Sequence, residues 1–111
     1  KVSVVFEHIG KKTWDTSMKL LGTGGRVVTC GATTGSDVSI NLTHLFFKQL
    51  SILGSTMSDI NTFKEVMTKI SSKKYFPLID KVISPLEIVG AHKYIESRRN
   101  IGKVIINFGD L

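Results

Sequence analysis

Hydrophobic positions along the chain follow two alternating patterns. Short, almost continuous runs of β-branched and other apolar residues are typical of strands that are buried on both faces, as in parallel sheets. Segments in which apolar residues recur every three or four positions are typical of helices with one buried face. The apolar runs occupy residues 2–6, 26–30, 51–56, 78–83 and 103–108. The pattern predicts strands at these five places, with a helix between each consecutive pair.

Helix-capping residues stand between these runs. Thr13 is expected to cap a first helix that runs to Leu21, with Gly22 just beyond its last turn. The segment Ser84-Pro85-Leu86-Glu87 has the pattern of a capping box with proline in the first turn, which predicts a helix to about Ser97. The two remaining helices are expected to begin at Asn41 or Thr43 and at Ser58 or Asp59.

Large apolar residues indicate where the core lies. Trp14, Met18 and Leu21 share one face of the first expected helix, and we expect all of them in the core. Of the adjacent residues Phe46 and Phe47, we expect one in the core and the other exposed, where an aromatic ring beside an edge strand favours a subunit contact.

The alternation of strands and helices indicates an α/β fold. Connections of a dozen or more residues imply parallel strands joined by right-handed crossovers. In such sheets ligands bind at the carboxyl ends of the strands. The loops at these ends, 7–10, 30–35 and 54–58, contain glycine or other small residues, which let a backbone approach a ligand closely. A ligand site is therefore expected at these loops.

The composition excludes several classes of protein. The 111 residues are 41% hydrophobic and 22% charged, a mixture too apolar and too varied for a disordered chain. No apolar run approaches the roughly 18 residues of a membrane span, and the first residues lack the apolar segment of a signal peptide. A single cysteine excludes a disulfide scaffold and favours a reducing compartment. We expect a cytoplasmic protein with no membrane partner.

The charge is basic but dispersed. Fifteen Lys and Arg against nine Asp and Glu give a net charge of +6, with no basic run longer than a pair. This distribution favours a solvated basic surface and no nucleic-acid partner, with a nucleic-acid binder kept as an alternative. The pair Arg98-Arg99 at the end of the last expected helix either stabilises the helix dipole or clamps an anion.

Two local patterns contain residues that could carry chemistry. The segment Gly22-Thr23-Gly24-Gly25 follows a helix and precedes a strand, the reverse of a phosphate-binding loop, so a plain turn is expected. Cys30, His8, His44 and His92 have no metal-ligand spacing, so no metal site is expected. Cys30 is interpreted as a small buried residue, with a nucleophile that uses His8 as its base as the alternative.

An ordered set of motifs carries a family resemblance. The segments Phe6-Glu7-His8-Ile9-Gly10, Gly24-Gly25-Arg26-Val27-Val28-Thr29-Cys30-Gly31, Leu53-Gly54-Ser55-Thr56 and Gly102-Lys103-Val104-Ile105 occur in this order. Together they resemble the C-terminal part of the medium-chain dehydrogenase/reductase superfamily, in its zinc-type alcohol dehydrogenase and quinone oxidoreductase branch. The resemblance covers essentially the whole chain.

This resemblance implies a particular organisation. Residues 1–57 would be the C-terminal half of a Rossmann-type NAD(P)-binding domain, contributing three parallel strands with crossover helices. Residues 58–111 would be the C-terminal segment that returns to the catalytic domain. The first three strands of the family sheet, the glycine fingerprint and the family's zinc ligands would lie outside this chain. The chain would therefore be a fragment that is inactive alone and binds no zinc, whereas zinc is expected in some full-length members.

The resemblance also assigns cofactor-contact positions. His8 and Ile9 correspond to a loop on the adenosine side of NAD or NADP. Cys30, Gly31 and Ala32 correspond to the stretch that lies along the nicotinamide. No catalytic residue and no metal ligand is assigned to this chain.

Three further positions complete this set. Ser55 and Met57 correspond to backbone groups that hold the carboxamide of the cofactor. Lys103 falls where many members place an Arg or Lys near the pyrophosphate, and it would act as a point charge.

The implied function belongs to the whole enzyme. It would transfer hydride between the nicotinamide and a small alcohol, carbonyl or quinone substrate. The alternative is a stand-alone α/β binding or interaction module without catalysis. The resemblance also implies that the strands at 2–6 and 51–55 of such a fragment would be sheet edges, so we expect a homo-oligomer formed through them.

Overall fold

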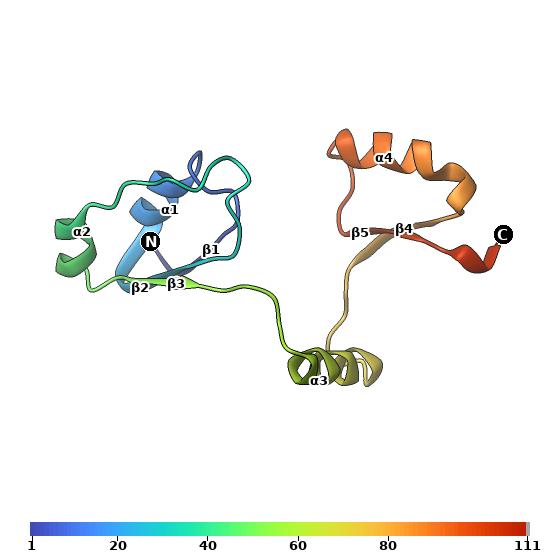
Figure 1. The fold of residues 1–111 in the computed structure, drawn as a ribbon, viewed down its shortest axis with the longest axis horizontal. Coiled ribbons are helices and arrows are strands. Elements are labelled where there is room, and N and C mark those ends of the chain that lie inside the picture. The colour runs from blue at the N-terminus through green and yellow to red at the C-terminus, as the bar shows by residue number, and fades with distance from the viewer. Residues whose placement is uncertain (111) are drawn as a thin grey trace. The chain divides into compact units, whose positions relative to one another are not determined.

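The computed structural model describes residues 1–110, which alternate between strands and helices (Figure 1). The chain forms two compact units, Lys1–Met57 and a second unit that begins at Ser58. They are called here the N-terminal unit and the C-terminal unit.

The N-terminal unit is a parallel three-stranded sheet with two helices. Its strands stand in the order β1-β2-β3, and both neighbouring pairs are parallel. This confirms the expected α/β fold with parallel strands. The elements are β1 (Val2–Glu7), α1 (Trp14–Leu20), β2 (Leu21–Thr29), α2 (Leu42–Phe47) and β3 (Ser51–Gly54).

The register of the sheet brings the ends of its strands level. Glu7 of β1 pairs with Thr29 of β2, and Thr29 pairs with Gly54 of β3, so the last residues of the three strands form one row. The loops that follow the strands therefore start side by side at one edge of the sheet.

The core lies on one face of this sheet. Trp14, Met18, Leu21, Val27 and Leu50 form the buried cluster, as expected for the first three of them. Partly buried Val5 of β1, Leu45 of α2 and Ile52 of β3 pack against this cluster, and in Figure 1 both helices lie on the same side of the strands.

The opposite face of the sheet is open to solvent. Val4, Phe6 and Leu53 project from it and are exposed. The expectation that the strands are buried on both faces is therefore wrong for this chain. An apolar run shows that both faces of a strand can be buried, but within this unit the helices cover only one face of the sheet.

The passage from α1 to β2 also differs from the expectation. Leu21 is already extended, and its fully buried side chain joins the core, so β2 begins there. The expected turn at 22–25 is instead an irregularity inside β2, where Val2 pairs with Leu21 but Val4 pairs with Arg26. The strand predictions at 51–56 and 103–108 are too long at their carboxyl ends, since β3 ends at Gly54 and the last strand at Ile106.

The C-terminal unit contains a two-stranded parallel sheet. The Asp59 side chain caps its first helix by accepting a hydrogen bond of 2.7 Å from the Thr62 amide. The predicted capping box is present, because the Ser84 hydroxyl accepts from the Leu86 amide and the Glu87 carboxylate from the Ser84 amide. The elements are α3 (Ile60–Ser71), β4 (Ile79–Ile83), η1 (Pro85–Glu87), α4 (Ile88–Glu96), β5 (Lys103–Ile106) and η2 (Phe108–Asp110).

Two further features of the surface bear on partners. Phe46 and Phe47 are 67% and 81% exposed, so the expectation that one of them lies in the core is wrong. The core position next to α2 is taken by Leu45 and Leu50 instead. No helix within residues 1–110 has the length and apolarity needed to cross a bilayer.

Candidate functional site

Backbone hydrogen bonds continue the sheet into the loops at its carboxyl edge. The Cys30 amide donates to the Glu7 carbonyl at 3.0 Å, and the Ser55 amide donates to the Thr29 carbonyl at 2.9 Å. Cys30 and Ser55 are thereby held beside the ends of the neighbouring strands. The three loops predicted from the sequence do begin at one edge of the sheet, which we call the carboxyl edge.

The loops after β1 and β2 are bonded to one another. The Thr34 amide and hydroxyl both donate to the Ile9 carbonyl, at 2.8 and 2.7 Å. The Thr33 hydroxyl donates to the His8 carbonyl at 3.3 Å, and the Lys11 amide to the Gly35 carbonyl at 3.0 Å. The two loops therefore form one surface with a defined backbone.

Close approach of these loops depends on glycine. A Cβ atom on Gly10 would lie 2.5 Å from the Gly35 carbonyl oxygen, and Gly10 has a left-handed φ of 92°. A Cβ atom on Gly31 would lie 3.0 Å from the His8 carbonyl oxygen. The glycines that the sequence placed in these loops thus serve first to bring the two loops together.

Side chains of the predicted contact set face solvent along this edge. His8, Cys30, Ala32 and Ser55 are exposed, and Met57 is 94% exposed. Ile9 and Gly31 are half-buried. Met57 also has a left-handed φ of 48°, which is uncommon outside glycine.

Cys30 and Lys103 belong to different units of the chain. Cys30 is a free, exposed thiol, so its interpretation as a buried residue is wrong. Within residues 1–110 no hydrogen bond is found between its thiol and His8, and its role as a nucleophile stays a hypothesis. Lys103 belongs to the C-terminal unit, where it is exposed at the start of β5 and its amide donates to the Leu78 carbonyl at 2.8 Å.

The carboxyl edge also contains a buried acidic residue, Glu7, for which no role was predicted. It ends β1 and is only 3% exposed. Its Oε1 accepts hydrogen bonds from the Ile9 amide at 2.8 Å, the Gly10 amide at 3.0 Å and the Thr13 hydroxyl at 2.9 Å. Its Oε2 accepts from the Ser17 hydroxyl.

These donors decide the ionisation of Glu7. Burial by itself raises the pKa of the carboxyl, but the hydrogen bonds from Ser17, Gly10, Thr13 and Ile9 outweigh burial and bring the pKa to about 2. Glu7 is therefore ionised across the neutral range. The sequence held a signal for this arrangement, because an acidic residue at a strand end is followed by glycine and two hydroxyl residues before and within the next helix.

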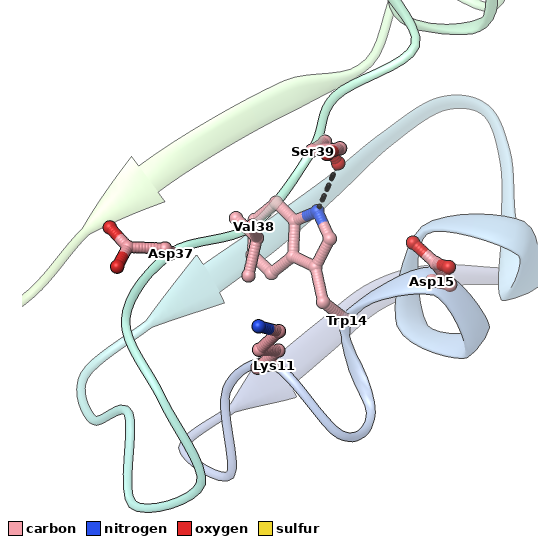
Figure 2. A pocket seen from close by; sticks show the side chains of 6 residues that line it. All are labelled: Lys11, Trp14, Asp15, Asp37, Val38 and Ser39. Atoms are coloured by element: carbon pink, nitrogen blue, oxygen red, sulfur yellow. Dashed lines mark hydrogen bonds between the residues drawn. The ribbon is translucent and has the colours of Figure 1, made fainter.

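Among the clefts of the N-terminal unit, two bear on the candidate site. One of about 350 Å³ is lined by Lys11, Trp14, Asp15, Asp37, Val38 and Ser39. Figure 2 shows the Trp14 indole in the middle of it, donating to the Ser39 carbonyl at 3.2 Å, with Asp15 and Asp37 on opposite sides. Carboxylates and an ammonium group mix in this cleft, so it selects no single charge.

The other cleft lies at the carboxyl edge itself. It measures about 210 Å³ and is lined mainly by small and aliphatic residues, among them Gly10, Thr29, Gly31, Ala32 and Ile52. It includes two of the predicted contact residues, Gly31 and Ala32. A flat, uncharged ring suits such a lining better than a phosphate group does.

Within residues 1–57, the carboxyl edge suits a ring of a dinucleotide, and no loop of the phosphate-binding type is present for its pyrophosphate. The carboxyl edge offers backbone and small side chains, but the glycine-rich segment 22–25 lies inside β2 and opens no helix, unlike a phosphate-binding loop. Within residues 1–110 no group of three or more His, Cys, Asp or Glu side chains is placed to hold a metal ion.

Comparisons with known proteins point in one direction. The family model described as zinc-binding dehydrogenase matches residues 1–72. The acryloyl-coenzyme A reductase of Sulfurisphaera tokodaii is 27% identical over 95% of this chain, which spans 32% of that protein. The crotonyl-CoA reductase of Streptomyces collinus is 30% identical over 93% of this chain, which spans 23% of that protein. The chain thus spans a third or less of these curated relatives.

Solved structures that resemble this chain also include dehydrogenases and reductases. A thermostable alcohol dehydrogenase from Pyrobaculum aerophilum, with cobalt and zinc bound, superposes with a TM-score of 0.80 at 31% identity, over 94% of this chain and 31% of that one. The 2-octenoyl-CoA carboxylase reductase CinF, in complex with NADP and 2-octenoyl-CoA, gives a TM-score of 0.78 at 28% identity, over 94% of this chain and 23% of that one.

Proposed function

The chain belongs to the zinc-binding dehydrogenase family, and we propose that it is part of an NAD(P)-dependent oxidoreductase. The observation that carries this proposal is the carboxyl edge, where loops from three adjacent parallel strands meet. That is the place where open parallel sheets bind their ligands. Solved relatives with NADP bound support the choice of cofactor.

On this proposal the chain positions the cofactor and contributes no reacting side chain. His8 and Ile9 would contact its adenosine side, and Cys30, Gly31 and Ala32 would lie along the nicotinamide ring. When bound, the nicotinamide supplies or accepts hydride. The protein contributes the orientation of the ring, through loops whose backbone is already fixed.

Three more positions take part in the proposed contacts. Backbone groups at Ser55 and Met57 would hold the carboxamide, and Lys103 would pair its charge with the pyrophosphate. Residues 1–57 would belong to the cofactor-binding domain, and the chain from Ser58 onward would return to the catalytic domain. A cytoplasmic location is proposed because Cys30 is a free, exposed thiol, which persists best in a reducing compartment.

The substrate class has two candidates. A small alcohol, carbonyl or quinone is the first, and the quinone oxidoreductase 1 of Escherichia coli is among the relatives, 28% identical over 85% of this chain. A conjugated enoyl thioester is the second, favoured because several relatives are acryloyl-CoA or crotonyl-CoA reductases. A carbonyl compound and an enoyl thioester both accept hydride at carbon from the reduced nicotinamide, and an alcohol gives hydride from carbon to the oxidised one, so the same placement of the nicotinamide ring serves either class.

A bulky side chain at the carboxyl edge tests the cofactor proposal. In the complete enzyme, Ala32→Tyr is expected to raise the Kd for NADH or NADPH about tenfold or more, because filling an occupied space costs about 1–3 kcal/mol. Quenching of protein fluorescence by the added cofactor measures this Kd. Ala32 lines the cleft at this edge, and its exposed side chain allows the substitution in the unliganded protein.

The matched control places the same ring elsewhere. Thr43→Tyr lies on α2, which leads into the amino end of β3, and Thr43 is exposed. The Kd of the Thr43→Tyr variant for NADH or NADPH is expected to stay within twofold of the wild-type value. Equal Kd values for Ala32→Tyr and the wild type would contradict the proposed site, and no cofactor binding by any of the three proteins would favour the stand-alone binding module.

The edge strands predict self-association of the chain. β1 and β3 are the outer strands of the N-terminal sheet, and exposed apolar residues such as Val4 and Leu53 project from its open face. Unpaired strand edges of this kind template pairing with a second chain. Size-exclusion chromatography with light scattering is expected to give a mass above 12.2 kDa at tens of micromolar.

Lysine on an edge strand provides the control for this prediction. Ser3→Lys and Ser51→Lys add a charge to the two outer strands at exposed positions and are expected to shift the chain toward monomer. Thr43→Lys adds the same charge on α2, away from the strand edges, and is not expected to shift the chain toward monomer. A wild-type chain that elutes as a monomer over the whole concentration range would refute the proposed oligomer.

A further inference from the structure

The buried position of the Glu7 carboxylate needs an explanation, because an apolar side chain would fill the same space at a lower cost in free energy. A charged group in an apolar interior costs free energy that an aliphatic side chain of similar size would not. Glu7 lies on the same face of the sheet as Val5, next along β1 toward the loop, and that face carries the core. An apolar residue there would extend the core, so the carboxylate must be matched to something specific.

Its hydrogen bonds are divided between two parts of the chain. Oε1 binds the loop, through the amides of Ile9 and Gly10 and the hydroxyl of Thr13. Oε2 binds α1, through the hydroxyl of Ser17. The carboxylate therefore fixes the path of residues 8–13 from the inside and ties that path to the helix.

The same loop is fixed from the outside by the neighbouring loop. The carbonyl groups of His8 and Ile9 accept hydrogen bonds from Thr33 and Thr34. Glu7 therefore holds the amides of Ile9 and Gly10 on one side of the loop, and the neighbouring loop holds the carbonyls of His8 and Ile9 on the other. What is left facing solvent is the His8 side chain, with Ile9 half-buried beside it.

We propose that Glu7 is a positioning residue for the cofactor, which shapes the loop after β1 so that His8 and Ile9 meet the adenosine side. This inference rests on the proposed function. Glu7 is only 3% exposed, too little to touch the ligand itself, so it acts through the loop. Its loss should therefore weaken cofactor binding while leaving the hydride step intact.

Two hydroxyl deletions separate this role from a merely structural one. Thr13→Val and Ser17→Ala each remove one donor to the same carboxylate, the first on the loop side and the second on the helix side. In the complete enzyme, Thr13→Val is expected to raise the KM for the cofactor about threefold to tenfold with kcat within about twofold, because part of the free energy of one hydrogen bond to a charge is lost from the binding-competent loop. Ser17→Ala is expected to lower the unfolding midpoint with KM within about twofold.

Glu7→Gln is the full test of the carboxylate. It is expected to raise the cofactor KM by about tenfold or more, again with little change in kcat. Without the charge, the Ile9 and Gly10 amides should exchange with deuterium about tenfold faster than in the wild type, which is measured without any cofactor. Where Glu7→Gln does not fold, the comparison of Thr13→Val with Ser17→Ala carries the test.

The outcomes are distinguishable. Equal KM shifts in Thr13→Val and Ser17→Ala, or a parallel fall of kcat and stability in both, would overturn the positioning role and leave a structural one. Unchanged exchange at Ile9 and Gly10 in Glu7→Gln would also overturn it. Failure of the wild-type enzyme to bind NADH or NADPH would refute the proposed function, whereas the exchange result would still decide whether Glu7 shapes the loop.

Discussion

Gly10→Ala is expected to destabilise the N-terminal unit by about 3 kcal/mol or more, the sum of a left-handed backbone penalty and steric overlap. The added methyl group would lie 2.5 Å from the Gly35 carbonyl oxygen and 2.9 Å from the Ala32 Cα atom, both of them backbone atoms that cannot rotate away. Relief of the overlap would separate the loops after β1 and β2. The contacts that form the carboxyl edge would then be lost together.

Substitutions at two other glycines separate the backbone penalty from the steric overlap. Gly24 has a left-handed φ of 73° with nothing within 4 Å of an added Cβ, so Gly24→Ala should cost only about 1 kcal/mol for its backbone conformation. Gly54 has an open position and no left-handed φ, so Gly54→Ala should change stability by about 0.5 kcal/mol or less. Urea unfolding, followed by Trp14 fluorescence, measures the free energy of unfolding of the three variants Gly10→Ala, Gly24→Ala and Gly54→Ala.

Trp14 suits this measurement because it is the only tryptophan and is buried in the core of the same unit. Its signal reports the N-terminal unit. A Gly10→Ala variant as stable as Gly24→Ala would contradict the close approach of the two loops, and would require a different path for residues 31–35.

Acid is expected to remove stability from the N-terminal unit between about pH 4.5 and pH 2. The pKa of Glu7 is lowered from its ordinary value of 4.5 to about 2 in the folded chain. Between these values the unfolded chain binds the proton and the folded chain does not, so falling pH favours unfolding. The stabilisation is complete above pH 4.5 and amounts to on the order of 2 kcal/mol, after an allowance for solvent screening.

Glu7→Gln isolates this contribution from the other carboxyls. Asp59 and Glu65 also have lowered pKa values, through hydrogen bonds from Thr62 and Lys69, but they lie in the C-terminal unit. The urea midpoint of wild-type Trp14 fluorescence should fall between pH 5 and pH 2.5 by more than that of Glu7→Gln. Parallel pH profiles for the two proteins would show that Glu7 is not held as an anion in the folded state.

The order of elements was predictable because it follows from local rules. Continuous apolar runs marked every strand, and the capping box at Ser84 marked the start of the last helical segment. The parallel pairing followed from the length of the connections, and it placed the loops after β1, β2 and β3 at one edge. The ligand roles of residues in these loops stay predictions, since they come from the family resemblance.

The errors share a physical cause, which is that local composition does not reveal what packs on a residue. Gly22-Thr23-Gly24-Gly25 has the composition of a turn, yet the burial of Leu21 draws the chain into β2 before it. Glu7 carries a charge and was assigned to a loop, because its donors at Thr13 and Ser17 are six and ten residues away and act only once α1 is folded. Thr13 in turn makes no capping bond and donates to Glu7 instead.

The way in which Glu7 is held has a consequence for the tolerance of the protein to salt. Dipoles of amides and hydroxyls surround this carboxylate, and dissolved ions do not screen contacts of that kind at close range inside the protein. The surface pair Lys69–Glu65 is open to such screening. The loop after β1 should therefore keep its conformation from low to high salt concentration. Any dependence of cofactor affinity on ionic strength would then arise from the phosphate groups of the cofactor itself.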